Sequence, residues 1–158
     1  MAAVRGATAE DLRPRRPGYA PRTMTAAPSD PSPTTPLPRK LGITPGARVA
    51  VMAAPAGFAD QFEEALVSTR LRGSFDIVIQ FATSRAVLER RLDVLVAALE
   101  PRGGLWIAWP KRSSGVASDL DDRTVRELGL GTGLVDNKVC AIDETWSGLR
   151  FVNRRRVH

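Results

Sequence analysis

Histidine and cysteine, on which much catalytic and metal-binding chemistry depends, are almost absent from this chain. Its 158 residues include one histidine and one cysteine. Because His158 is the final residue, we expect neither a Ser/His/Asp nor a Cys/His catalytic arrangement. Cys140 has no second cysteine as a partner, which excludes an internal disulfide and argues against a cysteine-based zinc site. We therefore predict no metal and no cofactor.

Long hydrophobic runs are missing too. No stretch approaches the roughly 18 apolar residues of a membrane-spanning helix. The N-terminus is basic, but it lacks the apolar segment of a secretory signal. We expect no membrane partner and a cytoplasmic location.

Lysine is scarce, with three lysines against twenty arginines, and the net charge of +6 is unevenly spread. Residues 1–40 hold seven Lys/Arg and three Asp/Glu, a balance of +4, whereas residues 41–158 hold sixteen and fourteen, a balance of +2. Because the larger part is nearly balanced, a nucleic-acid partner is not expected. The partners that stay open are a protein or a small anionic ligand.

Residues 1–38 have the composition of a disordered tail rich in Pro and Arg. Eight of the twelve prolines lie here, without the hydrophobic period of a helix or a strand. Such a segment cannot offset the entropy lost on ordering. Its basic stretch Arg13–Arg22 could touch an acidic surface, although a solvated linker is the commoner role of this composition. We place a single domain at 39–158.

The clearest structural signal is the stretch Phe75–Lys111. Near-continuous apolar character over Phe75–Ala82 is typical of a strand covered on both faces. Thr83 or Ser84 can cap the helix that follows. The apolar residues of that helix recur at spacings of one, three and four, and we expect them to face inward: Val87, Leu88, Leu92, Leu95, Val96 and Leu99.

The remaining elements follow from the same kinds of pattern. In chain order we predict a strand over 48–53, a helix over 58–71, a corner at 100–104, a strand over 105–109, a helix over 120–130 capped by Asp119, and a hairpin of two strands over 135–142 and 149–154. This order predicts an α/β fold, a compact Rossmann-like three-layer sandwich. Its mostly parallel sheet has about five strands and ends in an antiparallel C-terminal hairpin.

Three words of this sequence, GARVAV, FDIVIQF and LEPRGGLWIAW, resemble class I S-adenosylmethionine-dependent methyltransferases. The resemblance implies the strand order first, second, third, fifth, fourth, with the fifth strand antiparallel. The cofactor residues depart from that family. Its glycine-rich loop reads like G-x-G-x-G, whereas Ala53–Gly57 contains one glycine. Its second strand ends in an acidic residue that holds the cofactor ribose, and we expect no room for a second or third strand of that kind before Phe75.

Another set of motifs resembles a small bacterial family with no established activity. These are KLGITPG at 40–46, APAGF at 54–58, WPKRSSG at 109–115 and DETWSGL at 143–149. The resemblance implies a similar fold and no particular activity.

Ligands of open α/β sheets bind outside the carboxyl ends of the parallel strands. The loops expected at those ends carry hydroxyls, a cation, carboxylates and indoles. We assign no catalytic residue, and we predict these candidate ligand-binding residues: Pro55, Gly57, Thr83, Trp109, Lys111, Ser113, Ser114, Asp143, Glu144 and Trp146.

Lys111 has two interpretations. It could anchor an anionic ligand above Ser113 and Ser114, or it could brace the loops by an ion pair with Asp143 or Glu144. The pairing is the more common role of such a residue at a strand end.

The two indoles and the thiol also have structural alternatives. Trp109 and Trp146 could stack on a flat ligand or pack in the core, and packing is the commoner outcome. Cys140 lies between Val139 and Ala141, a position that favours a small buried hydrophobe over a nucleophile.

Three functional hypotheses follow. The first is a non-catalytic or accessory Rossmann-like domain that binds a partner or a small ligand at the strand ends. The second is an enzyme with a divergent site around Lys111, Ser113 and Asp143. The third is a degenerate methyltransferase-like protein.

Overall fold

A computed structural model of the chain describes residues 36–154. The prediction of a disordered tail falls, for residues 1–35, outside the described residues. A short helix, α1 (Leu37–Lys40), comes first. None of the helices between residues 36 and 154 has the length and apolar character needed to cross a bilayer.

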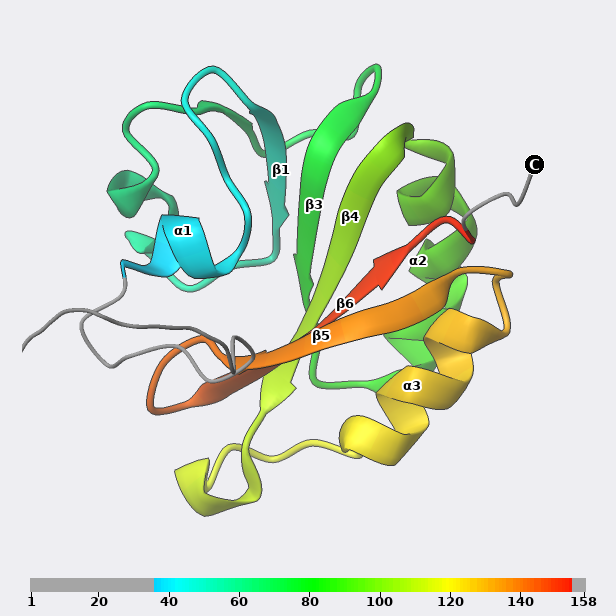
Figure 1. Cartoon of the computed structure of the whole chain (residues 1–158). Coiled ribbons are helices and arrows are strands. Elements are labelled where there is room, and N and C mark those ends of the chain that lie inside the picture. Colours follow the sequence, from blue (N-terminus) through cyan, green and yellow to red (C-terminus); the bar gives the residue numbers. More distant parts are fainter. Residues whose placement is uncertain (1–35, 155–158) are drawn as a thin grey trace, which may run out of the picture. The chain divides into compact units, whose positions relative to one another are not determined.

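The core of the structure is a six-stranded sheet in the order β2-β1-β3-β4-β6-β5 (Figure 1). Strands β2, β1, β3 and β4 are mutually parallel, and β6 runs antiparallel to both β4 and β5. This confirms the predicted fold class. The order β1-β3-β4-β6-β5 is the one that the methyltransferase resemblance implied. The strands are β1 (Arg48–Met52), β2 (Leu66–Ser68), β3 (Phe75–Phe81), β4 (Leu99–Pro110), β5 (Val135–Ala141) and β6 (Trp146–Val152).

The predicted helix over 58–71 is wrong. A 3₁₀ turn, η1 (Phe58–Gln61), is followed by β2, which pairs in parallel with β1. The Leu66 amide donates to the Ala47 carbonyl at 2.8 Å. The open edge of β1 thus offers backbone hydrogen-bond partners, which local helix propensity does not take into account. Val67 also has a high strand propensity. A second strand therefore does precede Phe75, contrary to the expectation that there was no room for one.

The Pro/Gly corner is part of strand β4 rather than a separate turn. Phe75 lies opposite Leu99 and Ile77 lies opposite Gly104, so the register between β3 and β4 shifts at this point. A Cβ on Gly103 would lie 2.9 Å from the carbonyl oxygens of Phe75 and Asp76. The bulge therefore requires glycine where the two backbones approach.

Two helices cover one face of the sheet, α2 (Arg85–Ala97) and α3 (Asp122–Leu130). Leu88, Leu92 and Leu95 are buried there, whereas Val87 is 44% exposed and the prediction that it faces inward is wrong. The opposite face is covered by α1, η1 and their flanking residues. There, Trp106 is fully buried and its indole Nε1 donates to the Leu41 carbonyl at 3.0 Å.

Cys140 is one of the buried residues on this second face. Burial raises the pKa of its thiol. This agrees with the interpretation of Cys140 as a small core residue, because a thiol that stays protonated is a weak nucleophile.

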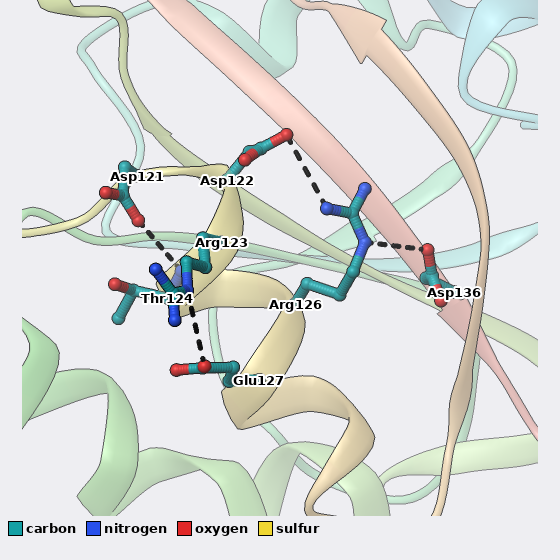
Figure 2. Close-up of polar contacts among 7 residues, drawn as sticks. All are labelled: Asp121, Asp122, Arg123, Thr124, Arg126, Glu127 and Asp136. Atoms are coloured by element: carbon teal, nitrogen blue, oxygen red, sulfur yellow. Dashed lines mark hydrogen bonds and ion pairs between the residues drawn. The ribbon is translucent and has the colours of Figure 1, made fainter.

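Asp121 caps the N-terminus of α3. The prediction that Asp119 is the cap is wrong. The Asp121 carboxylate accepts from the Thr124 amide at 2.8 Å. One turn further on, Arg126 bridges Asp122 at 3.6 Å and Asp136 of β5 at 3.1 Å, as Figure 2 shows. These contacts fix α3 against the edge of the sheet.

Close packing between α3 and β6 predicts opposite effects for two neighbouring glycines. A Cβ on Gly129 would overlap with the Phe151 ring, whereas a Cβ on Gly131 would meet its nearest atoms at 3.4 Å. We expect Gly129→Ala to lower the free energy of unfolding by about 2 kcal/mol through overpacking. Gly131→Ala, with helical φ, is the control and should be neutral or slightly stabilising. Urea denaturation measures both, and equal effects would contradict this packing.

The capping of α3 also predicts a dependence on pH. The amide and hydroxyl of Thr124 hold the pKa of Asp121 below its ordinary value of 3.8. A carboxyl with a lowered native pKa stabilises the fold above its ordinary pKa, and this contribution is lost as the pH falls through the native value. The difference in Tm between the wild type and Asp121→Ala should therefore be largest near neutral pH and shrink below pH 3.8. Thermal melts over pH 2–7 measure it, and a constant difference would contradict the cap.

Candidate functional site

The strand order creates a crevice between β1 and β3. From β1 the chain moves outward to β2 and then returns to the other side of β1 as β3. At such a switch point the connections leave the sheet in opposite directions, and ligands of open α/β sheets bind there, beyond the carboxyl ends.

Two hollows lie at this point, and Ala53 lines both. The first, of about 320 Å³, follows β1 and η1, and the second, of about 220 Å³, follows β3. We call them together the switch-point crevice. Its lining contains one charged residue, Asp60, and is otherwise apolar or uncharged: Val51, Ala53, Ala54, Pro55, Gly57, Phe58, Ala59, Thr69, Gln80, Phe81, Ala82, Thr83, Ser84, Val87 and Trp146.

The backbone turns sharply where β1 ends. Ala53 has a φ of 58°, the one positive value among the described non-glycine residues. An L-residue in this region costs of order 1 kcal/mol or more, and such strain tends to occur at ligand sites. Gly57, with φ 80°, then starts η1. The loop that holds Pro55 and Gly57 is thus folded tightly over the end of β1.

The N-terminus of α2 beside the crevice is already occupied by the protein's own acceptors. The Asp119 carboxylate accepts from the Arg85 amide at 2.7 Å, and the Ser84 hydroxyl accepts from the Val87 amide at 3.3 Å. The Thr83 carbonyl accepts from the Ser118 hydroxyl at 2.9 Å. The loop after β4 therefore closes this helix end, which would otherwise attract an anion.

An amide and an indole are among the residues that line the hollow after β3. Gln80 is buried, and its amide donates to the Phe81 carbonyl at 2.7 Å and accepts from Arg91 at 3.3 Å. Trp146 is half-buried and packs edge-on against Phe81, with ring centroids 5.0 Å apart. The indole therefore offers an exposed part to a ligand.

Lys111 lies in a separate cleft beyond the end of β4. This cleft of about 500 Å³ also contains Arg112, Asp119 and Asp121. No ion pair joins Lys111 to Asp143 or Glu144 within the described residues, so the predicted bracing by that pair is not present. The loops are joined by backbone instead, since the Lys111 amide donates to the Thr145 carbonyl at 2.8 Å.

Several predicted ligand residues hold loops together. The Ser114 hydroxyl donates to the Lys111 carbonyl at 2.6 Å and accepts from the Val116 amide at 3.1 Å. The Asp143 carboxylate accepts from the amides of Thr145 and Trp146, both at 2.8 Å. Trp109 is 5% exposed and belongs to the core. Ser113 and Glu144 are exposed and line none of these hollows.

Only five of the ten predicted ligand residues line a hollow, and they divide between two places. Pro55, Gly57, Thr83 and Trp146 meet at the switch-point crevice. Lys111 stands apart in the cleft after β4.

Solved structures that align with the chain include several methyltransferases. The chain aligns with a SAM-dependent methyltransferase from Aquifex aeolicus at a TM-score of 0.56 and 13% identity, covering 72% of this chain and 85% of that one. The fold is that of the class I methyltransferases. The magnesium protoporphyrin IX methyltransferase from Synechocystis PCC 6803 gives a TM-score of 0.54 at 12% identity, with 75% and 74% covered. A ribosomal protein L11 methylase from Lactobacillus delbrueckii subsp. bulgaricus gives 0.52 at 10% identity, with 75% of each chain covered.

Identities this low show the fold and leave activity open. No protein-family model and no curated protein sequence matches the chain. The resemblance to a small bacterial family therefore stays a prediction.

The residues of the crevice do not fit S-adenosylmethionine in the manner of that family. The resemblance places a ribose-binding carboxylate directly after β2. Strand β2 ends at Ser68, and the next residues are Thr69 and Arg70, which carry no carboxylate. The loop after β1 has one glycine, and the carboxylate nearest to it, Asp60, comes from η1. We derive no methyl-transfer step for this chain.

Sequence reasoning missed two residues that shape the crevice. Gln80 was detectable in principle, because it is the polar residue in the apolar run IVIQF. The positive φ of Ala53 could not be predicted from the sequence, because alanine rarely adopts such a backbone conformation.

The loop contacts predict that Asp143 is structural and that Lys111 is not. Asp143→Ala should lower the free energy of unfolding by about 1 kcal/mol, because two backbone amides lose their acceptor. Asp143→Asn keeps an oxygen acceptor and is the matched control. Lys111→Ala should change stability by less than about 0.5 kcal/mol. Chemical denaturation compares all three, and a large loss for Lys111→Ala would restore the bracing role.

Proposed function

We propose that this protein is a non-catalytic binding domain on a methyltransferase-like scaffold, and that it holds a small, flat ligand without strong charge in the switch-point crevice. The observation that carries the proposal is the lining of that crevice. It combines an accessible indole, two hydroxyls beside α2 and small apolar residues around a strained turn at Ala53.

The chemistry of the lining supports an uncharged ligand. The acceptors that cap α2 occupy the helix end that would favour an anion. The Gln80 amide is already hydrogen-bonded within the protein, so it contributes to the shape of the pocket more than to hydrogen bonding with a ligand. Trp146 then supplies a flat apolar surface, and aromatic contacts of this kind contribute about 1 kcal/mol.

The state of the polar residues supports a binding role over catalysis. Asp143, a member of the predicted divergent site, is engaged in loop hydrogen bonds, and so is Ser114 next to Ser113. Lys111 lies in a cleft apart from Trp146. A general base and a nucleophile within reach of each other are what catalysis would require.

A blocking substitution at the mouth of the crevice tests the proposal. Val87 lines the crevice and is 44% exposed, whereas Val94 lies on the same helix, is 49% exposed and is remote from the crevice lining. Uncharged nucleosides and similar flat heterocycles are titrated into the full chain and followed by tryptophan fluorescence and calorimetry. Val87→Arg should abolish binding, and Val94→Arg should leave it unchanged. Trp146→Phe should weaken binding about fivefold.

Two results would overturn this function. One is binding that Val87→Arg does not affect. The other is tight calorimetric binding of S-adenosylmethionine that Val87→Arg abolishes, because the crevice would then be a cofactor site of the methyltransferase kind.

A further inference from the structure

A further hollow lies at the opposite, amino-terminal end of the parallel strands. It is a groove of about 750 Å³ over the start of β4, the end of β6 and the start of β5. We call it the arginine groove. Its lining residues are Pro101, Arg102, Val135, Asn137, Arg150, Val152, Asn153 and Arg154. Three of these are arginines and none is acidic, so the groove carries a concentrated positive charge.

Arg150 occupies a position in the sheet that glycine makes possible. Its strand partners are Trp106 on β4 and Lys138 on β5. The guanidinium lies over Gly104, where an added Cβ would come within 2.5 Å of Arg150 Nε and 2.8 Å of a terminal nitrogen. The missing side chain at Gly104 thus forms a cradle for the cation.

The guanidinium of Arg150 lacks a counterion among residues 36–154. Its Nε is buried without a hydrogen-bond partner. Its neighbour across β5 is a second cation, Lys138, whose ammonium donates to the Lys40 carbonyl at 2.9 Å. Burial lowers the pKa of Arg150, with no carboxylate acting in the opposite direction.

An arginine in this state is costly to the fold. Arginine stays charged at all ordinary pH values, and a partly buried charge without a partner loses hydration that nothing replaces. Because an uncompensated buried charge destabilises a fold, an apolar side chain in its place is expected to be neutral or stabilising. The position is therefore poorly explained by stability and well explained by an anion that supplies the missing partner.

The rest of the groove is arranged around the same charge. Arg102 and Arg154 are exposed residues of the lining, one from β4 and one just after β6. The Asn153 amide donates to the Pro101 carbonyl at 3.0 Å, which holds these two chain segments together. Guanidinium groups match phosphate oxygens with paired hydrogen bonds, a geometry that suits this ligand class.

We propose that the arginine groove binds a small phosphate-bearing anion, with the partly buried Arg150 as its anchor and Arg102 and Arg154 at its rim. The site is separate from the switch-point crevice and does not rest on the function proposed for that crevice.

Pyrophosphate is the probe for this site, titrated into the full chain by calorimetry at low ionic strength. Arg150→Met keeps the length of the side chain and removes its charge. Arg90→Met is the matched control, because Arg90 is an exposed residue of α2, on the other face of the sheet. We expect Arg150→Met to weaken binding at least about tenfold, and Arg90→Met to leave it within about twofold. Gly104→Ala should also weaken binding, since the new methyl group displaces the guanidinium without removing it.

Thermal melts of the same variants separate binding from a structural role. Without pyrophosphate, Arg150→Met should have an unchanged or higher Tm. Pyrophosphate should raise the Tm of the wild type and of Arg90→Met, but not that of Arg150→Met. The proposal is overturned if pyrophosphate does not bind the wild type, or if it binds Arg150→Met and Arg90→Met equally. It is also overturned if Arg150→Met lowers the Tm strongly in the absence of the anion, because Arg150 would then be a structural residue.

Discussion

The parallel pairing of β3 with β4 is the constraint on which the rest of the structure depends. The two strands run side by side from Ile77 opposite Gly104 to Phe81 opposite Ala108. Their side chains are buried on both faces, and Trp106 and Ile79 are fully covered. Strands of this kind need a layer of chain on each side, because burial of their apolar surface is the main favourable term in folding.

The two layers that meet this need are unequal. On one face, α2 and α3 pack over the sheet, and α3 is fixed to β5 through Arg126 (Figure 2). On the other face the cover is α1, η1 and their neighbours, which lie beside β1 (Figure 1). Part of β4, β6 and β5 on that second face is left to line the arginine groove. The switch-point crevice and the arginine groove thus lie at opposite ends of the parallel strands.

The scaffold and the chemistry of this protein have different relationships to the methyltransferases. The chain shares the overall fold of solved methyltransferases, with a TM-score of 0.56 to the one from Aquifex aeolicus. The position after β2, where their ribose-binding carboxylate is expected, carries Thr69 and Arg70. The loop after β4 folds back so that Asp119 caps α2, which uses an acidic group internally. A fold can be retained when its polar residues change role, because packing and site chemistry depend on different side chains.

Periodicity in the sequence was sufficient to predict the fold class, helix α2 and the hairpin, whereas the order of five strands came from the resemblance to the methyltransferases. It was sufficient because apolar runs and their spacing reflect burial, which is decided locally by which face each residue presents. Two of the candidate ligand residues, Thr83 and Trp146, line the hollow beyond the carboxyl end of β3.

Only the tertiary structure decided the features that depend on contacts between distant residues. Strand β2 exists because the edge of β1 offers hydrogen bonds to a segment whose own pattern resembles a helix. Asp121 takes the capping role that was expected of Asp119, because the Asp119 carboxylate reaches the N-terminus of α2 across 34 positions of sequence. Arg150 lies 46 positions from the glycine that makes room for it, Gly104. A sequence by itself determines which residues seek burial, whereas the partner that each polar group finds is set by how the buried strands are brought together.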